Sequence, residues 1–364
     1  MGYNSVVPLN KECQNDLKWW INQLSTWNGR SLISPAPDLI ITTDASLKGW
    51  GGGAVCQGVH TRGLWTPEVS SLHINAPELK AALFHLQNFL LQSKENSCPS
   101  PNGQQNSSCL PTENGGGGRG GTRSQVLVGI AQELWECALR KEISLTAEYL
   151  PGYMNHEADW QSRNFRGASN LKLNPKVFHT LDQLWGPLTV DLFANRMNTQ
   201  LPNYVSWFPD PFAQATDAFQ IPWSNVKGYC FPPFSLICRF LAKIRKEQGT
   251  IVLIAPTWHA QAWYPVLLEM SCRHPILLPP LRDLLFSSNQ QPHPLILQGH
   301  LQLAAWMVTG KTCLQVEFQR TLQICSAPIC GEKALQGLTT APGNSGVAGV
   351  VNGRLIHFAP LWHL

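Results

Sequence analysis

The sequence has few charged residues, no long apolar run and no cysteine spacing typical of a cross-linked or zinc-bound scaffold. Charged residues make up 14% of the chain and hydrophobic residues 43%, which excludes a chain kept unfolded by its charge. The 11 cysteines are odd in number and no two are spaced as CxxC, which argues against a disulfide framework or a zinc ribbon. No apolar run reaches the length of a membrane span. We therefore expect reduced thiols, an intracellular protein of the nucleus or cytoplasm, and neither a membrane nor a disulfide-linked partner.

Length and charge distribution indicate more than one domain. A chain of 364 residues corresponds to two or three domains of ordinary size. Residues 1–170 carry 13 Lys and Arg against 14 Asp and Glu, whereas residues 171–364 carry 14 against 9. The positive excess of the second half permits a polyanionic partner without requiring one.

Periodicity predicts a mixture of helices and strands. Apolar residues at helical spacing predict helices over 11–30, 74–92 and 124–142. LIITTDAS and ISLTAEYLPG are typical of strands, and GWGGGAV between them is typical of a glycine-rich hairpin. In the second half, LTVDLFAN, GYCFPP and TIVLIAP are short strand-like runs, and helical stretches follow two of them. Such alternation favours an α/β sheet.

Three acidic residues occupy positions that burial alone would not choose. Asp44 ends an apolar strand, Glu78 lies in the first turn of a helix, and Asp159 opens another helix. Hard cations such as Mg²⁺ prefer oxygen ligands, and phosphodiester hydrolysis with two Mg²⁺ ions uses carboxylates of this kind. Taken singly, they are also explained as a turn residue, a helix-dipole charge and an N-cap. Their order and flanking sequence favour a shared metal site.

The sequence around these acids resembles a known family. The segments are TTDAS followed by GWGG, then HINAPELKAAL, and then LPGYMNHEADWQSR. They resemble the type-1 ribonuclease H domain of retroelement polyproteins, and more closely that of DIRS-type (tyrosine recombinase) retrotransposons. The lead-in LKWWINQLSTWNGR is similar to the segment that joins reverse transcriptase to ribonuclease H in those elements. The chain thus resembles a polyprotein fragment that lacks the reverse-transcriptase palm.

The resemblance implies a fold, an activity, a cofactor and a partner. The fold is an α/β ribonuclease H-like mixed sheet with flanking helices. The activity is Mg²⁺-dependent cleavage of RNA in an RNA–DNA hybrid, with Asp44, Glu78 and Asp159 as the catalytic, metal-binding residues of a two-metal site. Asn75 matches a position that contacts the 2′-hydroxyl side of the hybrid, the group that distinguishes RNA from DNA. The implied partners are RNA–DNA hybrids or DNA.

The fourth acid of the family is missing. The family has a strand with an Asp-Asn pair where residues 95–118 of this chain are polar and contain no Asp. A DNA sequence that encodes residues 95–116, read one nucleotide later, gives KTAVLLQMDNRTAVAYQQKMG, so the Asp would be encoded across the codons of Gly103 and Gln104. We interpret 95–118 as a frameshifted, disordered stretch, and the alternative is a true disordered insertion. Loss of one metal ligand predicts severely reduced or absent hydrolysis.

The second half resembles another family. DLFANRMNTQLPNYVSW, YCFPPFSLI and VLIAPTWHAQAWY resemble the phage-type DNA N6-adenine methyltransferase-like domain that follows ribonuclease H in DIRS-type elements. Its motif consists of a hydrogen-bond acceptor, two prolines and an aromatic ring that stacks on a flipped base. Pro232, Pro233 and Phe234 match, but Phe231 has no acceptor, which argues against methyl transfer. Asp191 would lie near S-adenosylmethionine, although no Gly-rich loop adjoins it.

Four segments are expected. They are a lead-in helix (1–37), the ribonuclease H-like domain (38–168), the α/β methyltransferase-like domain (169–310) and a weakly structured tail (311–364). Two other functions stay open beside an impaired ribonuclease H. One is a catalytically inactive nucleic-acid-binding retrotransposon remnant, and the other is a DNA adenine methyltransferase-like protein.

Overall fold

The structure falls into two compact units, Met1–Asp38 and Leu39–Leu364. The computed structural model describes residues 8–27, 37, 39–54, 59–92, 106–110, 124–141, 143–148, 150–151, 154–165, 171–286, 294–299, 301–324 and 346–361. The first unit contains helix α1 (Lys11–Trp27), whose residues Leu17, Trp20 and Leu24 recur at the helical spacing that predicted it. In the part of the chain that is described, no helix combines the length and apolar character needed to cross a membrane.

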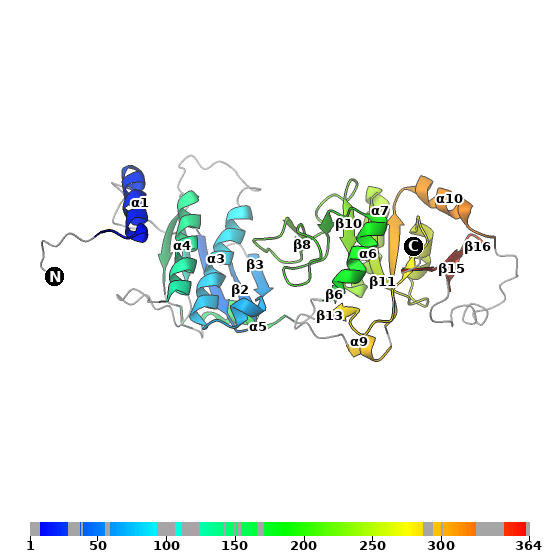
Figure 1. The fold of residues 1–364 in the computed structure, drawn as a ribbon, viewed down its shortest axis with the longest axis horizontal. Coiled ribbons are helices and arrows are strands. Elements are labelled where there is room, and N and C mark those ends of the chain that lie inside the picture. Colours follow the sequence, from blue (N-terminus) through cyan, green and yellow to red (C-terminus); the bar gives the residue numbers. More distant parts are fainter. Residues whose placement is uncertain are drawn as a thin grey trace, which may run out of the picture. The chain divides into compact units, whose positions relative to one another are not determined.

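The first sheet of the second unit is mixed, as predicted (Figure 1). Its strand order is β3-β2-β1-β4-β5, in which β1, β2 and β3 are antiparallel neighbours while β4 runs parallel to both β1 and β5. The strands are β1 (Leu39–Ala45), β2 (Gly49–Ala54), β3 (Val59–Leu64), β4 (Asn106–Leu110) and β5 (Ser144–Ala147). The helices of this part are α2 (Pro67–Ser70), α3 (Asn75–Gln92), α4 (Gln125–Arg140) and α5 (His156–Arg163).

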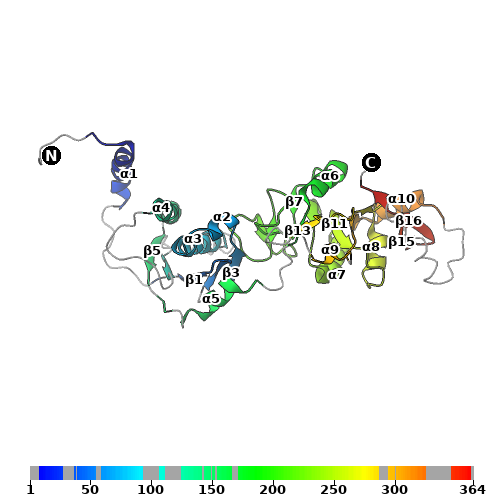
Figure 2. The ribbon, with the colours of Figure 1, turned by 60° about the horizontal axis from the view of Figure 1, so that its bottom comes forward.

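Glycines of β2 let helices approach both faces of this sheet. A Cβ atom on Gly51 would overlap the backbone of Gln161 in α5, and one on Gly52 would lie 2.6 Å from Nε2 of His85 in α3. Only glycine tolerates such contacts, so β2 can lie between the two helices. Figure 2 shows α3 and α4 on one side of the sheet and α5 on the other. The predicted hairpin forms between β1 and β2, but its glycines lie in the strand rather than the turn.

The expectation of disorder across 95–118 is wrong for residues 106–110. These residues form β4, which pairs with β1 through Ile41 and Cys109 and with β5 through Cys109 and Ala147. Ser and Asn are poor strand formers, but parallel neighbours on both sides offer backbone hydrogen-bond partners that local propensity does not consider. The remainder of 95–118 lies outside the described residues.

The second sheet is also mixed, and its strand order is β17-β12-β14-β11-β10-β7. The parallel pairs are β7 with β10, β10 with β11 and β12 with β17, whereas β14 is antiparallel to β11 and β12. Its strands are β7 (Val190–Asp191), β10 (Lys227–Cys230), β11 (Thr250–Pro256), β12 (Ile276–Leu277), β14 (Leu303–Thr309) and β17 (Ala359–Pro360).

Helices and two-stranded pairs complete this part. The helices are α6 (Pro175–Trp185), the 3₁₀ turn η2 (Phe234–Leu236), α7 (Ile237–Glu247), α8 (Tyr264–Met270), α9 (Pro294–Leu297) and α10 (Thr312–Thr321). The two-stranded pairs are β6 (Lys172–Leu173) with β13 (Leu285–Phe286), β8 (Val205–Ser206) with β9 (Ala215–Thr216), and β15 (Val347–Val351) with β16 (Arg354–His357).

The core of this part fills both faces of the sheet. β11 reads TIVLIAP and is buried from its second residue to its last, as expected for a strand covered on both faces. Trp223, Phe240 and Trp306 are fully buried in one of the two clusters that flank it. Burial of side chains this large supplies most of the stabilisation of such a layer.

The expectation of a weakly structured tail is wrong for residues 311–324 and 346–361. They form α10, the hairpin of β15 and β16, and β17, which hydrogen-bonds to β12 within the sheet. Phe358 packs against Trp306 with ring centroids 5.9 Å apart, and Ile356 is fully buried. Gly, Ala and Thr recur between these parts and suggested weak structure, whereas apolar residues such as Phe318, Ile356 and Phe358 attach the described parts to the core.

Candidate active site

Strand β1 delivers Asp44 to the face of the sheet that α5 covers. Ile41, Thr43 and Ala45 are buried, and Asp44 points to the opposite face because side chains alternate along a strand. Asp44 pairs with Gly51 of β2. Because Gly51 has no side chain, α5 lies directly against this pair of residues.

Ser162 connects β1 to α5. Its hydroxyl donates to Oδ2 of Asp44 at 2.5 Å and lies 2.9 Å from the carbonyl oxygen of Asp159, three residues earlier in the helix. The hydroxyl of Ser46 donates to the carbonyl oxygen of Ser162 at 2.7 Å, which fixes the end of α5 to the hairpin after β1. Ser162, which the sequence reasoning did not single out, therefore links the Asp44 carboxylate to the backbone of α5 at Asp159.

Opposing charges act on the Asp44 carboxyl. Burial is the largest cause and raises its pKa, while the hydrogen bond from Ser162 lowers it. The negative charge of Asp159 raises the pKa further, and the positive charge of Arg163 lowers it. Nε of Arg163 donates to Oδ1 of Asp159 at 2.6 Å, one helical turn away. Two carboxylates thus share one face of the sheet with a single guanidinium beside them.

The N-cap interpretation of Asp159 is wrong. The N-cap position of α5 is Asn155, whose side-chain N–H donates to the carbonyl oxygen of Thr43 on β1 at 3.1 Å. Asp159 lies in the first turn, where a negative charge interacts favourably with the helix dipole. Asn155 therefore attaches the start of α5 to β1, and Asp159 is carried toward Asp44.

Glu78 and Asn75 belong to α3, the helix on the other face. Both lie in its first turn and are half-buried, and the backbone N–H of Glu78 donates to the carbonyl oxygen of Ile74 at 3.0 Å. Among the described residues, no group of three or more His, Cys, Asp or Glu side chains is arranged to hold a metal ion. The shared metal site of Asp44, Glu78 and Asp159 therefore stays a prediction.

The residue types suit a hard cation. Mg²⁺ is commonly held by one or two carboxylates and keeps several waters, and Asp44 and Asp159 supply carboxylates. A two-ion site needs further bridging oxygens. The fourth acid of the family is absent from the sequence, and the two-metal site that the resemblance implies stays a prediction.

The proline motif of the second sheet follows β10 directly. Phe231 is 7% exposed and offers no acceptor, and Pro232 is also buried. The ring of Phe234 packs edge-on against Trp258, with centroids 5.1 Å apart, and contacts both core clusters. The aromatic side chain of this motif therefore packs within the fold.

Asp191, like the proline motif, is buried within the fold. It ends β7, is 2% exposed, and accepts the backbone N–H of Gln200 at 3.1 Å. Burial is the largest cause that raises its pKa to about 7, against hydrogen bonds from Gln200 and Phe193 that lower it. A carboxyl group engaged in this way does not fit a role in holding S-adenosylmethionine.

The comparisons with known proteins are sparse. No family model matches the chain, and no curated protein matches it. The crystal structure of prototype foamy virus protease–reverse transcriptase is similar to part of it, with a TM-score of 0.22 and 10% identity. The match covers 40% of this chain and 19% of that chain. This similarity is too low to indicate an activity.

Proposed function

We propose that residues 39–165 form a ribonuclease H-like domain that binds RNA–DNA hybrids and cleaves their RNA strand weakly or not at all. One observation supports the proposal: the carboxyl of Asp44 on the central strand interacts with the charge of Asp159 on α5, and Ser162 of α5 donates to Asp44. The two acids lie 115 residues apart in the chain.

The weak cleavage follows from the ligand set. When two Mg²⁺ ions are bound, such a site stabilises the attacking and leaving oxygens of the phosphodiester. In this chain Asp44 and Asp159 would help to hold an ion, and Ser162 holds Asp44 in place by its hydrogen bond. Burial, which raises the pKa of Asp44, disfavours the charged form of the carboxyl that a cation would bind.

Hybrid recognition is proposed for the start of α3. Asn75 begins this helix, and its amide side chain can both donate to and accept from a ribose 2′-hydroxyl. Glu78 lies one turn further along, so both residues that match the family motif are at the same end of α3. We therefore expect Asn75 to contribute to the preference for a hybrid over duplex DNA.

The test compares binding with cleavage on the full chain. We expect a labelled RNA–DNA hybrid to bind more tightly than duplex DNA of the same sequence, and Asn75→Ala to reduce that preference about tenfold, the effect of one to two lost hydrogen bonds. Asp16→Asn on α1 is the matched control and should change nothing. Equal affinity for hybrid and duplex DNA in the unaltered protein would contradict the proposal.

Cleavage in Mg²⁺ is measured on the same samples. We expect a rate close to background, with any residual activity lost in Asp44→Asn and retained in Asp16→Asn. Residual cleavage that is equal in the unaltered protein and in Asp44→Asn would come from a contaminant and would leave the chain as a binder only.

A further inference from the structure

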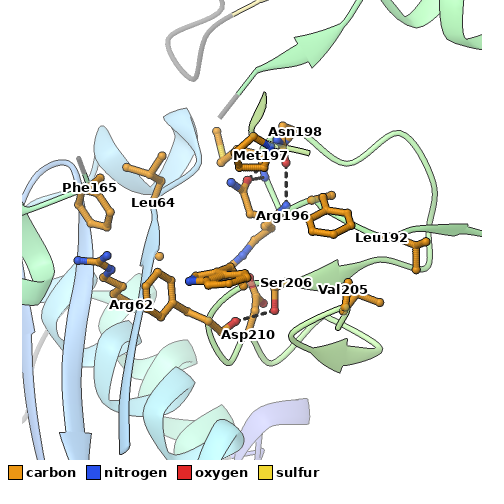
Figure 3. A pocket seen from close by; sticks show the side chains of 18 of the residues that line it. Arg62, Leu64, Phe165, Leu192, Arg196, Met197, Asn198, Val205, Ser206 and Asp210 are labelled. Atoms are coloured by element: carbon orange, nitrogen blue, oxygen red, sulfur yellow. Dashed lines mark hydrogen bonds and ion pairs between the residues drawn. The ribbon is translucent and has the colours of Figure 1, made fainter. Parts of the chain in front are cut away.

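A cavity of about 370 Å³ opens at the carboxyl ends of β7 and β10 (Figure 3). Residues 192–198, which follow β7, and Pro233, Ser235 and Leu236, which follow β10, form much of its wall. Parallel sheets bind ligands at this edge, because neighbouring chains leave the sheet in different directions there. The volume lies in the range of sites for a nucleotide-sized molecule.

The cavity carries an excess of positive charge. Of the described residues that line it, the charged ones are Arg62, Arg196 and Asp210. Arg196 and Asp210 are largely buried and form an ion pair at 3.4 Å, so their charges offset each other. Among the described lining residues, Arg62 is the cation that has no ion pair within the cavity. Figure 3 shows Arg62, with Leu64 and Phe165, on the side of the cavity opposite Arg196.

Arg62 is held in position by an aromatic ring and a carbonyl group. Its guanidinium carbon lies 4.3 Å from the ring centroid of Phe208 and 5.5 Å from that of Trp160. One of its N–H groups donates to the carbonyl oxygen of Asn164 at 2.7 Å. A guanidinium has five N–H groups, so others can meet an anionic oxygen in the cavity.

An exposed indole ring lines the same cavity. Trp207 is 50% exposed and directly precedes Phe208, whose ring Arg62 contacts. The hydroxyl of Ser206 donates to the carbonyl oxygen of Phe208 at 2.6 Å, which closes a turn around Trp207. Proteins hold an unpaired base and its phosphate with an accessible aromatic ring and a basic side chain in one groove.

We propose that this cavity binds one nucleotide unit of single-stranded nucleic acid, with its base stacked on Trp207 and its phosphate on Arg62. A free mononucleotide offers the same base and phosphate, so the strand and the free nucleotide must be told apart by experiment. Neither Asp44, Asp159 nor Asn75 lines the cavity, so its ligand is tested separately from the proposed hybrid-binding site.

The experiment measures binding of a labelled single-stranded oligothymidylate to the full chain by fluorescence anisotropy. We expect Trp207→Leu and Arg62→Gln each to weaken binding by about five- to hundredfold, the range found when one stacking contact is lost. Arg62→Gln should also lower the salt dependence by about 0.7 in the slope of log K against log salt, the value for one phosphate contact with a single strand.

Matched variants separate the site from general effects. Trp135→Leu removes an indole of the same exposure (49%) from α4, and Arg282→Gln removes an exposed guanidinium distant from the cavity lining. Neither should change the affinity by more than about twofold, well below the loss expected at a stacking contact. Unfolding midpoints equal to that of the unaltered chain show that the cavity variants are folded.

Competing ligands identify the source of the nucleotide. Thymidine monophosphate should compete only weakly, since it supplies one unit of the strand. The proposal is overturned if the oligonucleotide does not bind, if Trp207→Leu and Arg62→Gln bind it as the controls do, or if S-adenosylmethionine binds in this cavity and displaces it. If the unaltered chain prefers the hybrid but does not bind the oligonucleotide, this inference is overturned and the proposed function still stands.

Discussion

The sheet that contains β1 to β5 and the sheet built around β11 differ in what fills their central strands. β2 reads GWGGGA, and its glycines leave room for α5 on one face and α3 on the other. β11 reads TIVLIAP and fills the same space with its own side chains. The first arrangement lets polar groups of a helix, such as Ser162, reach the strand beside β2. The second arrangement gives a larger apolar core, and the one carboxyl on the strands of that sheet, Asp191, is buried away from solvent.

The two sheets place their polar groups differently. In the first sheet, the half-buried Asp44 lies on the face of the sheet that α5 covers. In the second, the polar and aromatic groups that remain accessible lie beyond the strand ends, around the cavity that Trp207 lines.

Removal of a large side chain should be most damaging in the second sheet. Phe240→Ala empties a fully buried site in the cluster beside β11 and should lower the free energy of unfolding by about 3–5 kcal/mol. Cys238→Ala, at an exposed position of the same helix, should change it by less than about 0.5 kcal/mol. Urea unfolding of both variants measures this. A loss for Phe240→Ala as small as that for Cys238→Ala would contradict the contrast.

The buried carboxyl of the second sheet should make stability fall as pH rises. The pKa of Asp191 is raised from 3.8 to about 7 in the folded state, so the folded chain binds more protons than the unfolded chain between these values. Its contribution is fully present below about pH 4 and is lost by about pH 7, by up to about 4 kcal/mol. Urea midpoints across this range should have a weaker downward slope in Asp191→Asn.

The buried histidine of the first sheet should act in the opposite direction. Burial is the largest cause that lowers the pKa of His85 from 6.5 to about 4, while Nδ1 donates to the carbonyl oxygen of Ala81 at 2.7 Å. The unfolded chain therefore binds more protons between these values, and stability falls as pH drops from 6.5 to 4, by about 3 kcal/mol. His85→Leu should remove this acid sensitivity, and an unchanged slope would show that His85 stays neutral in both states or is solvated.

Added volume should be damaging in the first sheet at Gly51. Gly51→Ala forces a Cβ atom against Gln161 and Ser162, and should destabilise the chain by about 1–3 kcal/mol and displace α5 from Asp44. Gly129→Ala is the matched control, since no atom lies within 4 Å of its added Cβ on α4. That change should stabilise by about 0.5–1 kcal/mol because helix propensity improves. Tolerance of Gly51→Ala would mean that α5 does not lie against β2.

Local patterns predicted the elements that carry the acids. β1 is a β-branched run that ends with Asp44, and α5 follows the pattern NHEADWQSR, so strand and helix were both predictable from short-range sequence. Ser162 was open to prediction as well, because a residue three positions after Asp159 lies on the same side of a helix. The sequence thus indicated the position of Ser162, and the structure identified Asp44 as its hydrogen-bond partner.

Long-range contacts were not predictable in the same way. The contact of Arg62 with Phe208 joins residues 146 positions apart, and no periodicity in the sequence predicts it. β4 and β17 are short and poor in strand-forming residues, and they exist because neighbouring strands supply their hydrogen-bond partners. The face of the sheet that α3 covers is a further long-range feature that spacing alone leaves open.

The most direct measurement compares hybrid cleavage in Mg²⁺ by the chain as it stands with cleavage by a chain in which residues 95–116 are replaced by the shifted reading, KTAVLLQMDNRTAVAYQQKMG. If a missing metal-binding acid is what disables an otherwise assembled site, the replacement should restore cleavage, and Asp44→Asn should abolish it in the restored chain. Rapid cleavage by the chain as it stands, or restored cleavage that survives Asp44→Asn, would contradict the account.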